Sequence, residues 1–286
     1  MRDVAGDSNR INAHLRARAV PAGGGILPGM NLNLSGQKVA VFGAARGIGM
    51  AIAREFSQEG AVVHGFDRSA DPANGFPGKS LALGDVTVLE EVRGFASEIG
   101  DVDHVVFCVG VGSGKFGFPF WNLSPSDWIR VLEINLIGAV NVAHSFAPRM
   151  AERRSGSLLF LASVAGQIGS PTDPPYSAAK AGLINFVQCA AKDLAPFGVR
   201  VNALSPGMVQ TDLNQSVWRA GQALLKPEER QSYEEWGGAK IEKLAPLGRW
   251  QTPPEFGAMA VYLASEHARN ITGQTLNIDG GQVMHS

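Results

Sequence analysis

Residues 38–49 read KVAVFGAARGIG. A short apolar run is followed by three glycines spaced as GxxxGxG, and a helical pattern, MAIAREF, continues from Met50. Glycines allow a tight turn and a close approach of the backbone to a pyrophosphate, while the N-terminus of a helix supplies N–H donors and a positive dipole. A glycine cluster alone is a weak signal, but this one lies between an expected strand and an expected helix, as a dinucleotide-binding turn requires. The candidate cofactor contacts in this turn are Gly43, Arg46, Gly47, Ile48 and Gly49.

The same alternation of strand and helix continues along the chain. Short runs rich in β-branched or aromatic residues predict strands at 38–42, 61–66, 80–84, 104–109, 157–162, 200–205 and 275–279. Helical patterns lie between them at 48–59, 87–99, 125–152, 177–195 and 254–265. Strands that are apolar on both faces and alternate with helices form a parallel sheet covered on two sides. The expected fold is therefore α/β: a single-domain, Rossmann-like, doubly wound parallel sheet of about seven strands, with helices on both faces.

Two segments fall outside this alternation. Residues 1–33 predict a flexible N-terminal extension, with Met30 as an alternative start, so the catalytic domain is expected to span 34–286. Residues 208–245 form a long insertion before the last helix. An insertion of that length in a compact domain is more often a lid or a binding loop than an accident. We expect a substrate lid here, with aromatic residues that pack it onto the body of the domain.

Composition excludes several classes of protein. The chain has 286 residues, 45% of them hydrophobic, and a net charge of -1, so it can bury a sizeable core and gives no support to binding of nucleic acid or of an anionic membrane. No apolar run reaches the ~18 residues of a transmembrane helix. The histidines lack HxH or HExxH spacing, and Cys108 and Cys189 form neither a CxxC pair nor a disulfide framework. We expect no metal site and a reducing, cytoplasmic address.

The second predicted strand is followed by Asp67, 18 residues beyond Gly49. A carboxylate at this position can accept both ribose hydroxyls of an adenosine and would repel a 2′-phosphate, which favours NAD. Arg46 and Arg68 could instead pair with a 2′-phosphate, which keeps NADP open. Asp85 and Val86, at the end of the third strand, are candidates for the adenine ring.

A tyrosine and a lysine share one helix face further along the chain. Tyr176 and Lys180 stand four residues apart at the start of a long helical segment. A nearby ammonium group lowers the pKa of a phenol, which suits proton transfer to or from a carbonyl or alcohol oxygen. Ser163 lies 176 - 163 = 13 residues earlier, at the carboxyl end of the fifth strand, where open α/β sheets place their ligands.

With these motifs in order, the sequence resembles the short-chain dehydrogenase/reductase family, in its branch of about 250 residues, from roughly residue 34 to residue 281. The motifs that carry the resemblance are GAARGIG, EINLIG, LASVAG, YSAAK and NALSPGMVQTDL, closed by PLGRW, ITGQ and DGG. Together they are far more specific than any one of them. Two departures stand out: Phe42 replaces the usual Thr before the glycine turn, and FCVG at 107–110 replaces Asn-Asn-Ala-Gly.

The resemblance implies a role for each matching residue. Tyr176 would be the general acid or base, Lys180 would bind the nicotinamide ribose and lower the pKa of Tyr176, and Ser163 would hold the substrate oxygen. Asn135 would hold a water molecule for proton relay. The remaining implied cofactor contacts are Val109, Gly110, Pro206, Gly207, Met208 and Thr211. The resemblance also implies a homotetramer.

We therefore expect an NAD(P)-dependent oxidoreductase, with NAD favoured, that interconverts a secondary alcohol (a sugar, polyol or cyclic alcohol) and its ketone by hydride transfer. The first alternative is an NADPH-dependent 3-oxoacyl (acyl-carrier-protein type) or carbonyl reductase. The alternative from another class is a non-catalytic protein that binds and senses a dinucleotide.

Overall fold

The computed structural model of the chain describes residues 31–70, 75–115, 119–170 and 172–284. It separates into two units, Met1–Asn31 and Leu32–Ser286. The expected extension lies, up to residue 30, outside the described residues, and so does the alternative start at Met30. All that follows concerns the second unit.

The sheet is parallel throughout and has seven strands in the order β3-β2-β1-β4-β5-β6-β7. The strands are β1 (Lys38–Phe42), β2 (Val62–Asp67), β3 (Ser80–Leu83), β4 (His104–Phe107), β5 (Gly156–Leu161), β6 (Val199–Pro206) and β7 (Thr275–Ile278). The strand order reverses between β1 and β4, and ligands of such sheets bind at the carboxyl ends on either side of that reversal. The predicted fold class is confirmed, and each predicted strand is present within one or two residues.

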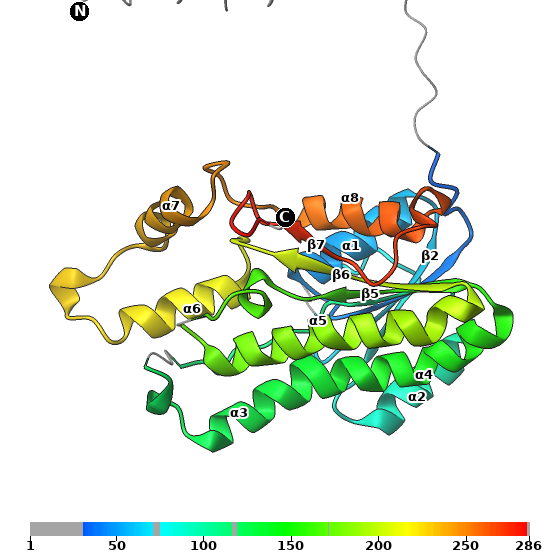
Figure 1. Cartoon of the computed structure of the whole chain (residues 1–286), viewed down its shortest axis with the longest axis horizontal. Helices are drawn as coiled ribbons and strands as arrows, with labels where there is room; N and C mark the ends of the chain where they lie inside the picture. The colour runs from blue at the N-terminus through cyan, green and yellow to red at the C-terminus, as the bar shows by residue number, and fades with distance from the viewer. Residues whose placement is uncertain (1–30, 71–74, 116–118, 171, 285–286) are drawn as a thin grey trace, which may run out of the picture. The chain divides into compact units, whose positions relative to one another are not determined.

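Helices cover both faces of the sheet, as Figure 1 shows, with α1 and α8 on one face and α2, α4 and α5 on the other. The helices are α1 (Gly47–Gln58), α2 (Leu89–Ile99), α3 (Pro125–Leu132), α4 (Gly138–Arg153), α5 (Pro174–Leu194), α6 (Asp212–Gln222), α7 (Tyr233–Leu244) and α8 (Pro253–Ala264). Side chains of β1 alternate between the two cores, with Phe42 in one and Val41 in the other. Both sides of the central strands are therefore buried, which explains their unbroken apolar sequences.

The helix expected at 125–152 is not continuous. A π-helical turn, Glu133–Ile137, separates α3 from α4. The amide of Asn135 donates to the carbonyl of Val131 at 2.8 Å, four residues earlier, and so competes with the α-helical backbone bond. The spacing of apolar residues in the sequence does not predict this π-turn, because the turn depends on the direction of one polar side chain.

The insertion at 208–245 folds into α6 and α7 around a cluster of aromatic rings. The ring of Tyr233 lies 5.8 Å from that of Trp218 and 5.7 Å from that of Trp250. Its hydroxyl donates to Asn214 Oδ1 at 2.8 Å, which joins α7 to α6. These aromatic residues pack the insertion against itself and against Trp250. Across the described residues, no helix has the length and apolar character needed to cross a bilayer.

Candidate active site

The glycine turn joins β1 to α1 at the carboxyl edge of the sheet. Gly43 has φ +78°, and a Cβ there would lie 3.0 Å from the backbone of Cys108 and Val109. A Cβ on Gly49 would lie 2.0 Å from the carbonyl oxygen of Gly43, so the turn closes only with glycine. Helix α1 begins without a side-chain cap, which leaves its first N–H groups and its dipole for a ligand. This cradle fits a pyrophosphate.

Asp67, at the end of β2, reaches back to this turn. Its Oδ2 accepts a hydrogen bond from the Ala45 amide at 2.9 Å. The contact fixes the carboxylate beside the turn and leaves lone pairs on both oxygens. Arg46 and Arg68 make only long, exposed ion pairs, at 3.9 Å to Asp212 and to Asp85 respectively. The structure thus brings the carboxylate of Asp67 and the loosely held cations Arg46 and Arg68 close to the glycine turn.

The third strand ends beside the same region. Asp85 accepts hydrogen bonds from the amide and the hydroxyl of Thr87, and the first of these is the largest of the causes that lower its pKa. Val86 is buried, and its carbonyl accepts from Asn141 at 2.9 Å. The side chain of Asp85 therefore accepts its hydrogen bonds from Thr87, two residues further along the chain. Asn141 holds the backbone at Val86, and the sequence motifs did not reveal this contact.

The segment after β6 forms the opposite wall of the cradle. A Cβ on Gly47 would lie 3.8 Å from Cγ2 of Thr211, which caps α6 by accepting from Asn214 N. Pro206 ends β6, and a Cβ on Gly207 would lie 2.9 Å from Asp279 Cα. Met208 is buried against α7. The glycine turn and the Thr211 segment, far apart in sequence, therefore face each other.

Val109 and Gly110 follow β4 and connect the cradle to the polar residues of the site. A Cβ on Gly110 would lie 3.4 Å from Asn135 Oδ1 and 3.5 Å from Lys180 Nζ. Asn135 is fully buried, donates to the carbonyl of Val111 at 2.8 Å and accepts from its amide at 3.3 Å. Its side chain therefore holds the loop after β4 in place, a contribution that the sequence did not suggest.

Ser163, Tyr176 and Lys180 come together at the ends of β5 and at the start of α5. Burial raises the pKa of Tyr176 to about 12, while a hydrogen bond with Ser163 lowers it and the charge of Asp173 raises it. Burial lowers the pKa of Lys180 to about 8. Lys180 Nζ lies 5.6 Å from the centre of the Tyr176 ring and donates to the carbonyl of Leu161 at 2.8 Å. In this arrangement burial is the main influence on the pKa of both groups, and the ammonium of Lys180 is directed at a carbonyl oxygen. The lowering of the Tyr176 pKa by Lys180 stays a prediction.

The first departure from the family pattern, Phe42, has a packing explanation. Phe42 is fully buried, and its ring lies 5.2 Å from that of Phe66, 5.5 Å from that of Phe95 and 5.8 Å from that of Phe146. Aromatic packing therefore supports the turn where a threonine hydroxyl would. Burial raises the pKa of Cys108 to about 12, so its thiol is neutral beside the glycine turn.

Comparisons with known proteins agree with this geometry. A family model described as enoyl-(acyl carrier protein) reductase matches residues 43–283. The 3-oxoacyl-[acyl-carrier-protein] reductase FabG of Thermotoga maritima is 32% identical over 265 residues, which cover 88% of this chain and all of that protein. Nodulation protein G of Azospirillum brasilense is 34% identical over 259 residues, with 86% and 98% coverage.

The chain belongs to the short-chain dehydrogenase/reductase family. Among solved structures, aldohexose dehydrogenase (AldT) of Thermoplasma acidophilum matches with a TM-score of 0.75 and 27% identity, over 88% of this chain and 96% of that one. Membership of this family makes the protein an NAD(P)-dependent oxidoreductase.

One part of the site was missed by the motifs of the family. Asp173 is buried, and its Oδ2 accepts from the amide of Ser113 in the loop after β4, at 2.8 Å. The sequence DPPY, an acid and two prolines directly before Tyr176, was the available signal.

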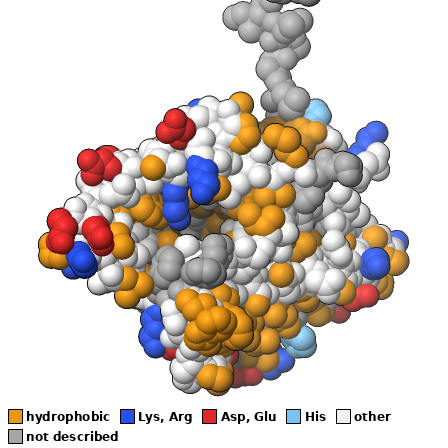
Figure 2. All heavy atoms as spheres, turned by 60° about the vertical axis from the view of Figure 1, so that its left-hand side comes forward, with side chains coloured by type: hydrophobic (Ala, Val, Ile, Leu, Met, Phe, Trp, Pro, Cys, Tyr) orange, Lys and Arg blue, Asp and Glu red, His pale blue; other side chains and the backbone are white. Residues whose placement is uncertain are grey.

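Figure 2 turns the side that carries α6 and α7 toward the viewer and shows hydrophobic side chains at its surface among charged ones. Exposed apolar residues include Phe120 and Trp121, which precede α3, and Leu224, which follows α6.

Proposed function

We propose that this protein is an NAD-dependent dehydrogenase that oxidises a secondary alcohol of a sugar, polyol or cyclic alcohol to its ketone. The observation that carries the proposal is the hydrogen-bonded pair of Ser163 and Tyr176, with Lys180 one turn further along the same helix. These groups follow the carboxyl end of β5, and a Cβ on Gly110 would lie 3.5 Å from Lys180 Nζ. The arrangement suits the removal of a proton from an alcohol oxygen.

A bound nicotinamide would accept the hydride from the carbinol carbon. Gly43, Arg46, Gly47, Ile48 and Gly49 would hold its pyrophosphate, and Thr211 with Pro206, Gly207 and Met208 would hold the opposite side. Val109 and Gly110 would contact it through their backbones, and Asp85 and Val86 would lie at the adenine. These assignments rest on the glycine cradle and on the uncapped start of α1.

The protein side chains would manage the proton. Ser163 holds the substrate oxygen against Tyr176, and the phenolate of Tyr176 takes the hydroxyl proton as the base. Because burial raises the pKa of Tyr176 to about 12, a nearby positive charge must stabilise the phenolate during the reaction, and Lys180 is the cation on the same face. Asn135 holds a water molecule that carries the proton onward.

Asp67 supports the preference for NAD, because its carboxylate, held at the glycine turn by Ala45, would repel a 2′-phosphate. The second candidate function is an NADPH-dependent 3-oxoacyl or carbonyl reductase. The named relatives that are 3-oxoacyl-[acyl-carrier-protein] reductases favour it, as do the loosely paired Arg46 and Arg68. We further propose a cytoplasmic homotetramer in which residues 208–245 cover the substrate.

The test combines binding and turnover. NADH and NADPH are titrated into the purified protein, and nicotinamide fluorescence is followed. Tighter binding of NADH supports the dehydrogenase, and tighter binding of NADPH supports the reductase. Changing Tyr176→Phe is expected to lower turnover by at least 10²-fold while leaving NADH binding within about twofold, because only the proton-transfer group is removed. Turnover that persists in this variant would refute Tyr176 as the base, and nucleotide binding without turnover in the wild type would favour the sensing protein.

A further inference from the structure

Asp173 carries a buried oxygen that no group in the described part of the chain satisfies. The residue is 7% exposed, and its Oδ1 has no hydrogen-bond partner among the described residues. Its other oxygen, Oδ2, accepts from the amide of Ser113 at 2.8 Å. An unpaired carboxylate oxygen in a protein interior destabilises the fold, so its presence calls for a physical explanation.

Helix capping does not supply that explanation. An aspartate before a helix normally accepts from the N–H of the second or third helical residue. Here the first two residues of α5 are Pro174 and Pro175, which have no N–H. The amide of Tyr176, the third residue, favours charge on the Asp173 carboxyl group, yet Asp173 makes no side-chain cap hydrogen bond. The start of α5 therefore leaves Oδ1 open.

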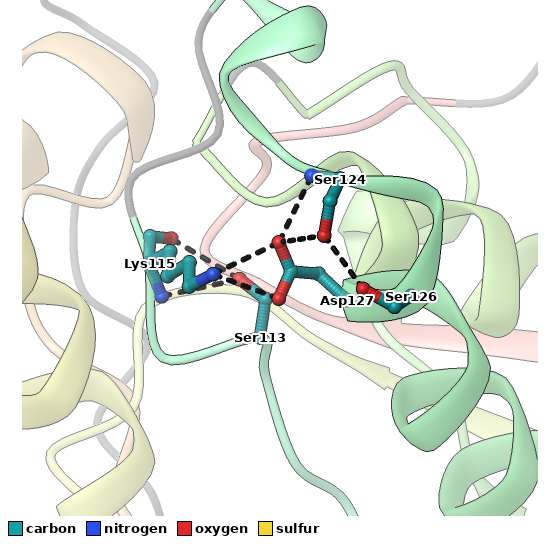
Figure 3. Close-up of polar contacts among 5 residues, drawn as sticks. All are labelled: Ser113, Lys115, Ser124, Ser126 and Asp127. Atoms are coloured by element: carbon teal, nitrogen blue, oxygen red, sulfur yellow. Dashed lines mark hydrogen bonds and ion pairs between the residues drawn. The ribbon is translucent and has the colours of Figure 1, made fainter.

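Ion pairing does not supply it either. The described ion pairs do not include Asp173, and burial raises its pKa, with no cation among the causes of the shift. Lys115 stands only two residues beyond Ser113 but is held by Asp127, with its Nζ 2.8 Å from Oδ1 and 3.0 Å from Oδ2 of that residue. Figure 3 shows this pair, together with the contacts of Ser124 and Ser126 at the start of α3.

The carboxyl group of Asp173 contacts the loop after β4, and its charge acts on Tyr176. A Cβ on Gly112 would lie 2.6 Å from Oδ2, so the loop approaches this closely only because glycine stands there. Asp173 precedes Tyr176 by three residues, and its charge raises the pKa of that phenol, which places the two groups within electrostatic reach. Asp173 is therefore part of the immediate surroundings of the reaction.

The loop that contains Ser113 is joined at its outer end to the start of α3. Lys115 and Asp127 form an ion pair in which the lysine side chain is 57% exposed and the aspartate side chain 18% exposed. Gly114 has φ +76° and open space around it.

We propose that Asp173 is a specificity-determining residue, whose Oδ1 accepts a hydrogen bond from a second hydroxyl group of the substrate, on the carbon next to the one that is oxidised. The inference rests on the proposed dehydrogenase function and narrows its substrate class to vicinal diols, as found in sugars and cyclic polyols. A hydroxyl supplies the missing donor. An acyl chain supplies only methylene groups and a carbonyl oxygen, whose lone pairs would face those of the carboxylate.

The test uses cyclohexanol and cyclohexane-1,2-diol, each diol diastereomer separately, because these alcohols differ by a single neighbouring hydroxyl. With NAD, the wild type is expected to show a kcat/KM for the better diol about ten- to a hundredfold above that for cyclohexanol, the range of a hydrogen bond to a charged group. Asp173→Asn should reduce this preference to a fewfold, and Asp173→Ala should abolish it. Because the charge of Asp173 also acts on Tyr176, the turnover of cyclohexanol is expected to change in both variants, and the ratio of the two kcat/KM values is the readout.

Asp127→Asn is the matched control, because it releases the outer end of the same loop without removing Oδ1. It should change kcat/KM for both alcohols by the same factor. Equal use of diol and cyclohexanol by the wild type would overturn this inference and leave the proposed function standing. An equal loss of both activities in Asp173→Asn would also overturn it, since the residue would then be structural. Failure of the wild type to oxidise any of these alcohols would count against the proposed function itself. A thermal melt verifies folding, and the nearly isosteric Asn variant decides the outcome if the Ala variant does not fold.

Discussion

Two buried polar clusters lie at opposite edges of the same sheet, and they are built differently. At the amino edge, His104 on β4 is bonded through Nδ1 to Ser157 Oγ at 2.8 Å and through Nε2 to Gln37 Oε1 at 2.5 Å. Burial lowers the pKa of His104 to about 4, so the ring is neutral and fully paired. At the carboxyl edge, Tyr176 and Lys180 have pKa values displaced in opposite directions, and Asp173 has an unpaired oxygen.

This difference in hydrogen bonding distinguishes polar groups that stabilise the fold from polar groups that take part in function. A buried polar group that serves only the fold is stable when every donor and acceptor finds a partner, as at His104. Groups that exchange protons or bind a ligand must keep part of their bonding capacity open, and this lowers the stability of the fold. We propose that the cluster at Tyr176 is of the second kind. Three substitutions, one at the amino edge and two at the carboxyl edge, test this contrast.

The largest effect is expected for Lys180→Met. Turnover should fall by about 10²–10⁴-fold, because the cation that stabilises the phenolate is lost. Between pH 8 and 10.5 the unfolded chain holds a proton at this lysine that the folded chain has released, so wild-type stability rises with pH across that window, by an amount of order 3 kcal/mol. Denaturant unfolding at pH 8 and pH 10 should show this rise in the wild type and not in the variant. An identical dependence of stability on pH in both proteins would mean that burial does not lower the pKa of Lys180.

A smaller effect, confined to stability, is expected for His104→Gln. Between pH 4 and 6.5 the unfolded chain binds a proton at His104 that the folded chain excludes, so wild-type stability falls as the pH drops through this range, by an amount of order 3 kcal/mol. The variant should lose this part of the acid sensitivity, at a cost of about 1–2 kcal/mol at pH 7 for altered hydrogen bonds. Its turnover should stay within twofold of wild type. A large loss of turnover in a folded variant would mean that the amino edge of the sheet also contributes to catalysis, contrary to this contrast.

The smallest effect is the change in stability caused by Asp173→Asn. Burial raises the pKa of Asp173, so above pH ~3.9 the folded chain keeps a proton that the unfolded chain has lost, and wild-type stability falls as the pH rises through the raised pKa. The variant should lack that fall and be about 1 kcal/mol more stable than the wild type at pH 7. Unfolding curves of both proteins at pH 4 and pH 7 measure the difference. A variant that is less stable at pH 7 would show that the ionised carboxylate is well paired after all.

Local pattern alone determined much of this protein. The strands and the sheet follow from apolar runs of the right length between turn residues, because burial on both faces requires them. The glycine turn and the Tyr176–Lys180 pair could also be predicted from the sequence, because each depends on residues at most a few positions apart.

Only the tertiary structure decided the rest. Asn135 ends α3 in a π-turn because its amide bonds both Val131 and the loop at Val111, 24 residues away. Asp173 meets Ser113 across 60 residues, and Phe42 replaces a polar contact with three aromatic neighbours from distant segments. The displaced pKa values follow from the same cause. Spacing along a chain reveals which side chains share a face, whereas burial and unpaired atoms depend on what the rest of the fold brings against that face.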